Sequence, residues 1–168
     1  MRVFSSSSAL QPNNRSPRGK RQKLLAVSSG GGHWIQLLRV SAAFQNCDVT
    51  FVTTHAAYRS QVKDHKFWTV NDSNLSSKLG LMKTAAQLTR IIWVEKPDVV
   101  ISTGAAPGYF ALRLARLIGA HTIWLDSIAN VEKLSISGFR VGHYADLWLT
   151  QWPHLARPEG PHYAGSVL

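Results

Sequence analysis

Short apolar runs alternate with segments of helical spacing along most of this chain. The runs are rich in β-branched and aromatic residues and end at turn residues, and they cover positions 24–27, 49–53, 67–70, 98–101, 121–125 and 145–149. Between them the spacing predicts helices over 33–44, 79–95 and 109–118, and a loop with a short helix, interrupted at Gly138, over 127–143. Apolar strands separated by helices are typical of a parallel sheet covered on both sides. We therefore expect an α/β fold, a Rossmann-like parallel sheet with helices on both faces.

Positive charge is concentrated at the start of the chain. The net charge is +10 over 168 residues, and the first 23 positions contain no acid but six cations, Arg2, Arg15, Arg18, Lys20, Arg21 and Lys23. Residues 1–22 are also aperiodic and rich in Ser, Asn and Pro, which predicts a disordered basic arm. The arm is either a solubilising tail or a contact with an anionic surface. The rest of the chain divides into a Rossmann-like domain over 23–150 and a tail over 151–168 with no evident core role.

Several classes of protein and site are disfavoured. Cys47 is the only cysteine, so no disulfide can form within the chain, which suits a reducing compartment. The seven histidines show no metal-ligand spacing, and we expect neither a metal nor a cofactor. The body of the chain is only weakly basic and has no nucleic-acid-binding motif, so we expect no nucleic acid partner. No apolar run approaches the length of about 20 residues that a membrane-spanning helix needs.

The loop at 28–33 is the strongest candidate for a ligand site. Ligands of parallel sheets bind at the carboxyl ends of strands, where loops meet helix amino termini. Gly30, Gly31 and Gly32 let the backbone approach a ligand closely, and free amides with the helix dipole favour a phosphate. The alternative is a tight turn without a ligand. His33 follows the glycines and is either a general base or phosphate contact, or a simple surface residue.

Two further loops offer polar groups at the same edge of the sheet. Ser102 and Thr103 supply hydroxyls, and Gly104 and Gly108 permit a close approach, although a plain turn fits equally well. Asp126 and Ser127 follow the strand at 121–125, where the acid could bind a sugar hydroxyl, act as a base, or cap the next segment.

Two common phosphate-binding motifs are absent. The glycine loop has no Gly-Lys-Ser/Thr ending, so the chain is not a P-loop NTPase. Ile35 stands where a dinucleotide fingerprint has its third glycine, and Thr53, Thr54 and His55 stand where it has an acid.

Four motifs follow one another along the chain: Ser-Gly-Gly-Gly-His at 29–33, Ser-Thr-Gly at 102–104, Leu-Ser-Ile-Ser-Gly at 134–138 and Gln-Trp-Pro at 151–153. Taken together, these motifs resemble a known family, the membrane-recruiting subunit of the two-subunit UDP-GlcNAc transferase of asparagine-linked glycosylation. The likeness covers residues 23–168 and is closer to bacterial counterparts in capsule and exopolysaccharide synthesis.

The resemblance implies the amino-terminal, acceptor-side half of a GT-B glycosyltransferase divided between two chains. A small nucleotide-sugar-binding subunit would complete the enzyme, which would move a sugar from a UDP-sugar to a polyprenyl-diphosphate-linked saccharide without a required metal. His33 would be the base or a diphosphate contact, and Asp126 is the second candidate base. The implied diphosphate and acceptor contacts are Ser29, Gly30, Gly31, Gly32, Ser102, Thr103, Gly104, Gly108 and Ser127, and the implied partner contacts are Gln151, Trp152, Tyr163 and Gly165.

The resemblance also implies a place at the membrane. Many relatives carry an amino-terminal membrane-spanning helix, where this chain has a polar basic arm. We therefore expect a cytoplasmic chain that is peripheral on the cytoplasmic face of the membrane. The arm would act with an apolar helix face, either Trp34, Leu37 and Leu38 or Leu81, Ile92 and Trp93. The alternatives are a non-catalytic recruiting scaffold for the partner and a standalone Rossmann-like domain that binds a phosphorylated metabolite.

Overall fold

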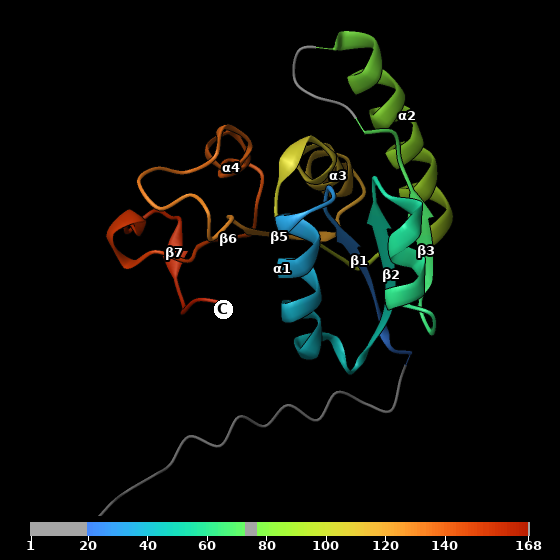
Figure 1. The fold of residues 1–168 in the computed structure, drawn as a ribbon, viewed down its shortest axis with the longest axis horizontal. Helices are drawn as coiled ribbons and strands as arrows, with labels where there is room; N and C mark the ends of the chain where they lie inside the picture. Colours follow the sequence, from blue (N-terminus) through green and yellow to red (C-terminus); the bar gives the residue numbers. More distant parts are fainter. Residues whose placement is uncertain (1–19, 73–76, 168) are drawn as a thin grey trace, which may run out of the picture.

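A single parallel sheet organises the fold (Figure 1). The computed structural model describes residues 20–72 and 77–167. In these residues seven strands pair, all parallel, in the order β3-β2-β1-β4-β5-β6-β7. Their bounds are β1 Gln22–Val27, β2 Cys47–Thr53, β3 Lys66–Thr69, β4 Val99–Ser102, β5 His121–Leu125, β6 Leu147–Thr150 and β7 His162–Tyr163. The expected fold class is confirmed.

Helices cover both faces of the sheet. In the described ranges the α-helices are α1 Gly32–Val40, α2 Lys78–Glu95, α3 Ala105–Leu117 and α4 Ile136–Val141, and the 3-10 turns are η1 Ser41–Phe44, η2 Ala56–Gln61 and η3 Pro153–Leu155. Helix α1 packs on one face with Trp34 and Leu37 fully buried. Helices α2 and α3 pack on the other face and bury Leu88, Ile92 and Leu112. The two cores explain why the strands are apolar on both sides. No helix within the described ranges has both the length and the apolar character needed to cross a bilayer.

The predicted arm falls largely outside the described residues. Residues 1–19 are not described, and Gln22, expected at the end of the arm, instead begins β1 beside Cys47 of β2. The predicted helix at 79–95 matches α2, which begins one residue earlier and ends at the same residue. Helix α3 begins four residues earlier than predicted, because Pro107 fits the first turn that follows Gly104.

Gly138 lies inside α4 and does not interrupt it. A Cβ on Gly138 would lie 2.3 Å from Oδ1 of Asp126, so the glycine lets the helix approach that carboxylate. Ser135 caps the helix by accepting a hydrogen bond from the Gly138 amide at 2.8 Å.

The described part of the tail, residues 151–167, belongs to the folded domain, which corrects the prediction that the tail has no evident core role. Its strand β7 pairs with β6, and the side chain of Gln151 is 1% exposed. Strand β7 has only two residues, which is too short for the alternating pattern by which a strand is identified in a sequence. The folded domain described here therefore runs beyond residue 150.

Glu95 at the end of α2 ties this helix to the edge of the sheet. Its carboxylate accepts hydrogen bonds from Nε1 of Trp68 at 3.0 Å and from Nζ of Lys66 at 3.0 Å. Burial alone would raise the pKa of Glu95, but these hydrogen bonds and the charge of Lys66 outweigh it and hold the pKa below the ordinary value of 4.5. The same contact raises the pKa of Lys66.

Replacing Glu95 with alanine should lower the free energy of unfolding by about 2–4 kcal/mol, because Trp68 and Lys66 lose their acceptor. Because the pKa of Glu95 is lower in the folded than in the unfolded state, its negative charge stabilises the fold fully at pH values above the unfolded-state pKa. This stabilisation is lost as the pH falls through the folded-state pKa. The deficit of the variant should therefore be constant at neutral pH and shrink below pH 4.5. Urea unfolding across pH measures it, with Glu159→Ala as the exposed control. A deficit that grows on acidification would contradict the assignment.

Candidate functional site

The glycine loop and the Ser102–Gly104 loop meet at the carboxyl edge of neighbouring strands β1 and β4. Nδ1 of His33 lies 2.9 Å from the carbonyl oxygen of Thr103, and the Thr103 hydroxyl donates to the His33 carbonyl oxygen at 2.7 Å. A Cβ on Gly104 would lie 2.4 Å from the imidazole ring. The sequence thus brings His33, Thr103 and Gly104 together as a unit, with the glycine making room for the ring.

This geometry fixes the proton on the imidazole. A carbonyl oxygen only accepts hydrogen bonds, so Nδ1 carries the hydrogen. In the neutral ring Nε2 is then unprotonated and can accept a proton. The His33 side chain is half-buried and lies in the first turn of helix α1.

Two of the three glycine amides are occupied, which corrects the expectation that all three are free for a ligand. Gly30 N–H donates to Oγ1 of Thr54 at 3.2 Å, and Gly31 N–H donates to the hydroxyl of Tyr58 at 3.0 Å. In the described part of the chain, the amides of Gly32 and His33 donate to no group. They are the first two amides of α1, which an α-helix leaves without intrahelical partners.

The sequence reasoning missed three residues that shape the glycine loop. Thr54, His55 and Tyr58 follow β2, and the exposed His55 ring lies so close to Gly30 that a Cβ there would be 2.0 Å from it. In the sequence analysis Thr54 and His55 stand only as positions that lack a dinucleotide-binding acid, and Tyr58 is not named. The useful signal was topological, because the carboxyl end of β2 lies beside that of β1 in a parallel sheet.

Other expected ligand contacts are buried in the fold. Ser102 and Thr103 are both fully buried, and a Cβ on Gly108 would lie 1.8 Å from Oγ of Ser102. Gly108 therefore serves helix–strand packing. Ser127 is also buried and accepts from the Ala129 amide at 3.3 Å. Ser29 is half-buried beside the open end of α1.

Asp126 organises the loop after β5, which corrects its assignment as a second candidate base. The residue is 1% exposed. Its carboxylate accepts from the Ser135 hydroxyl at 2.7 Å and from the Ser135 amide, Nδ2 of Asn130 and Nε1 of Trp124, each at 3.1 Å. A carboxylate with four donors and no solvent access holds its loop in place and does not reach a substrate.

A family match places this chain among known proteins. The family described as "Oligosaccharide biosynthesis protein Alg14 like" matches residues 55–167. The chain belongs to this family. The expected kinship is confirmed at this level, while the closer likeness to bacterial capsule proteins stays a prediction. The Alg14-like match covers the loops at 102–108 and 126–133 and the tail, and begins after the glycine loop.

Curated relatives agree with this membership. The UDP-N-acetylglucosamine transferase subunit ALG14 of Yarrowia lipolytica is 26% identical over 168 residues, which is 83% of this chain and 78% of that protein. The mouse protein of the same name is 24% identical over 87% of this chain and 82% of its own length.

Solved structures show how the Alg14-like fold relates to larger enzymes. Acinetobacter baumannii MurG matches 86% of this chain with a TM-score of 0.70 and 15% identity. The UDP-N-acetylglucosamine 2-epimerase of Rickettsia bellii matches 80% with a TM-score of 0.63 and 14% identity. The chain spans only 45% and 40% of those two proteins. Its fold corresponds to the amino-terminal half of such GT-B-like structures.

The tail of the Alg14-like chain divides into buried and exposed residues. Nε2 of Gln151 donates to the carbonyl oxygen of Asp126 at 2.9 Å, so Gln151 packs inside this chain and is not on a surface that a partner could reach. The half-buried Trp152 donates from Nε1 to the Ile128 carbonyl oxygen at 2.9 Å. Tyr163 and Gly165 are exposed and stay predicted partner contacts.

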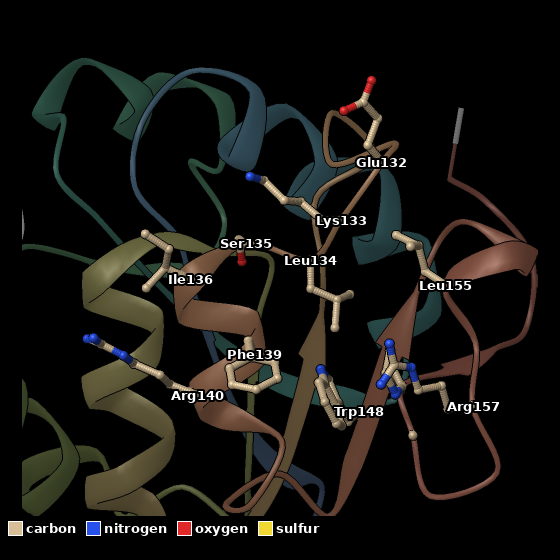
Figure 2. A pocket seen from close by; sticks show the side chains of 12 residues that line it. Glu132, Lys133, Leu134, Ser135, Ile136, Phe139, Arg140, Trp148, Leu155 and Arg157 are labelled. Atoms are coloured by element: carbon tan, nitrogen blue, oxygen red, sulfur yellow. The ribbon is translucent and has the colours of Figure 1, made fainter.

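A cavity of about 630 Å³ lies between the loop with α4 and the segment that follows β6. Figure 2 shows Leu134, Phe139 and Trp148 pointing toward one another, with Leu155 and Arg157 opposite them. Among the described residues, the buried indole N–H of Trp148 has no acceptor. The cavity is lined on one side by residues of the motif at 134–138 and on the other by tail residues Leu155, Arg157, Gly160 and Pro161.

Proposed function

We propose that this chain is the acceptor-side subunit of a split glycosyltransferase that moves a sugar from a UDP-sugar to a polyprenyl-diphosphate-linked saccharide. The observation that carries the proposal is an Alg14-like chain folded as half of a GT-B-like enzyme, with a histidine and two free amides at the carboxyl edge of its sheet. The relatives named as subunits of UDP-N-acetylglucosamine transferase support the same reading.

In the proposed reaction His33 acts as the general base. Nε2 of His33 accepts the proton of the acceptor hydroxyl as that oxygen attacks the anomeric carbon of the donor sugar. The bond between that carbon and the UDP oxygen breaks, and UDP leaves with the electron pair. The Thr103 carbonyl holds the ring in the tautomer that this step needs.

The free amides at the start of α1 suit the phosphate of the acceptor. Gly32 and His33 present two N–H groups at the positive end of the helix dipole, which is a favourable place for an anion. His55 on the far side of Gly30 adds a second imidazole to the same loop.

A second chain would supply the donor half. The present chain spans less than half of the MurG structure that it matches, and a GT-B-like enzyme has two such halves. The exposed tail residues Tyr163 and Gly165, next to the cavity beside β6, are where we place that partner.

Reconstitution of sugar transfer tests the proposal. This chain and the domain-sized product of a neighbouring gene are assayed separately and together. The donor is labelled UDP-GlcNAc, UDP-glucuronate, UDP-glucose or UDP-galactose, and host membranes supply the acceptor. We expect lipid-extractable product only when both chains are present. Activity of this chain alone would contradict a divided enzyme. An assembled pair that transfers normally with a disabled His33 would favour the recruiting scaffold, and tight binding of a phosphorylated metabolite by the monomer would favour the standalone domain.

A further inference from the structure

Helix α2 presents large apolar side chains to solvent along most of its length. Leu79 is 81% exposed, Met82 69% and Trp93 75%. Spacings of 3, 11 and 14 residues are close to whole helical turns at 3.6 residues per turn, so these three side chains lie on one side of the helix. In Figure 1 the helix stands at the margin of the molecule. Leu88 and Ile92, on the opposite side of the helix, belong to the core.

Cations flank this apolar stripe. Lys83 and Arg90 lie two turns apart on the same side of α2, and both are exposed. We call Leu79, Met82, Lys83, Arg90 and Trp93 the α2 outer face. The helix has one acid, Glu95, which is buried and paired with Lys66. The neighbouring helix α3 adds Arg113 and Arg116 and contains no acid, although Arg116 pairs with Asp146 of a later loop.

The structure corrects the apolar faces expected to meet lipid. Trp34 and Leu37 of α1 are 1% and 0% exposed, and Ile92 of α2 is 3% exposed. They belong to the two cores. Of the residues expected to contact lipid, Trp93 is the one that is classed as exposed.

We propose that the α2 outer face is a docking surface for an anionic lipid bilayer. A stripe of Leu, Met and Trp between cations, without exposed acids, is the composition of helices that lie in a membrane interface. The stripe extends over about 21 Å, from Leu79 to Trp93, at 1.5 Å per residue. It is the convex side of a single helix, which a deformable lipid surface can cover, whereas a protein partner would need a matching groove. The exposed cations Lys83 and Arg90 complement anionic headgroups.

This inference does not depend on the proposed transferase activity, because lipid binding is measured without a sugar donor. The full chain is mixed with vesicles of phosphatidylcholine alone or with phosphatidylglycerol, and the bound fraction is measured by sedimentation. We expect binding to the anionic vesicles that weakens as salt is raised. The triple variant Leu79→Ser, Met82→Ser, Trp93→Ser and the double variant Lys83→Glu, Arg90→Glu should each bind at least about tenfold more weakly.

The controls separate the α2 outer face from the basic arm, which all variants retain. Ile35→Ser with Arg39→Glu makes the same kinds of change at exposed positions of α1, on the opposite side of the sheet, and should bind like the unchanged chain. Brominated lipid quenches tryptophan fluorescence, and Trp93→Phe should lower the quenched fraction. Circular dichroism checks the fold of each variant.

Several outcomes would overturn the proposal. They are full vesicle binding by both the triple and the double variant, quenching that is unchanged in Trp93→Phe, and no binding of the unchanged chain to anionic vesicles. If the chain is a dimer that the triple variant converts to a monomer with vesicle binding intact, the face contacts a second copy instead.

Discussion

Replacement of His33 with alanine should lower sugar transfer by the reconstituted pair by about 10²- to 10⁴-fold, the usual contribution of a positioned general base. The imidazole has Nδ1 committed to the Thr103 carbonyl oxygen at 2.9 Å, which leaves Nε2 to take the acceptor proton. The measurement is the initial rate of lipid-linked product at saturating donor. Co-purification of the two chains shows that the complex is intact.

A matched variant distinguishes base catalysis from loop positioning. His33→Asn keeps an N–H donor that can reach the Thr103 carbonyl oxygen but has no group to accept a proton. We expect it to be as slow as His33→Ala. Recovery of most of the activity in His33→Asn would mean that the residue orders the loop, and near-normal turnover in both variants would remove His33 from the proposed mechanism.

Replacement of Asp126 with alanine should lower the free energy of unfolding by about 3–5 kcal/mol, because a buried carboxylate with several donors disappears. Ser135, Asn130 and Trp124 would lose their acceptor inside the fold. For a domain of this size the midpoint of thermal unfolding should fall by about 10 °C. Urea unfolding followed by circular dichroism measures the change.

The control for this variant is Asp64→Ala. Asp64 is exposed and its carboxylate has no hydrogen-bond partner among the described residues, so this change should stay within about 0.5 kcal/mol. A loss of transfer in Asp126→Ala without a loss of stability would show that the carboxylate reaches the substrate, contrary to its burial.

The main elements could be predicted because their signal is local. The runs at 24–27, 49–53 and 121–125 are strands whose apolar character reflects two cores, one on each face of the sheet. Strand β7 could not be predicted, because two residues carry no periodicity and the strand exists only through its pairing with β6. The role of Gln151 depends on the same tertiary contact.

The candidate site was predicted at the level of loops but not of individual groups. The glycines at 30–32 and His33 lie where the topology rule places them. Whether a glycine amide is free depends on Thr54 and Tyr58, which lie more than 20 residues away and approach only in the folded sheet. From the sequence Asp126 could be a base, a sugar contact or a cap. Its four hydrogen-bond donors in the fold assign it a structural role.

The position of β4 beside β1 has a consequence for the order of folding. Every pairing in the sheet is parallel, so no hairpin can nucleate it, and the junction of β1 with β4 joins segments about 75 residues apart. Closing so long a loop is among the slowest steps for a chain of this kind. The contact of His33 with Thr103 spans 70 residues across the same junction. The two halves of the chain can each gather local structure early, but the site between them comes into being only when the most distant strands have met.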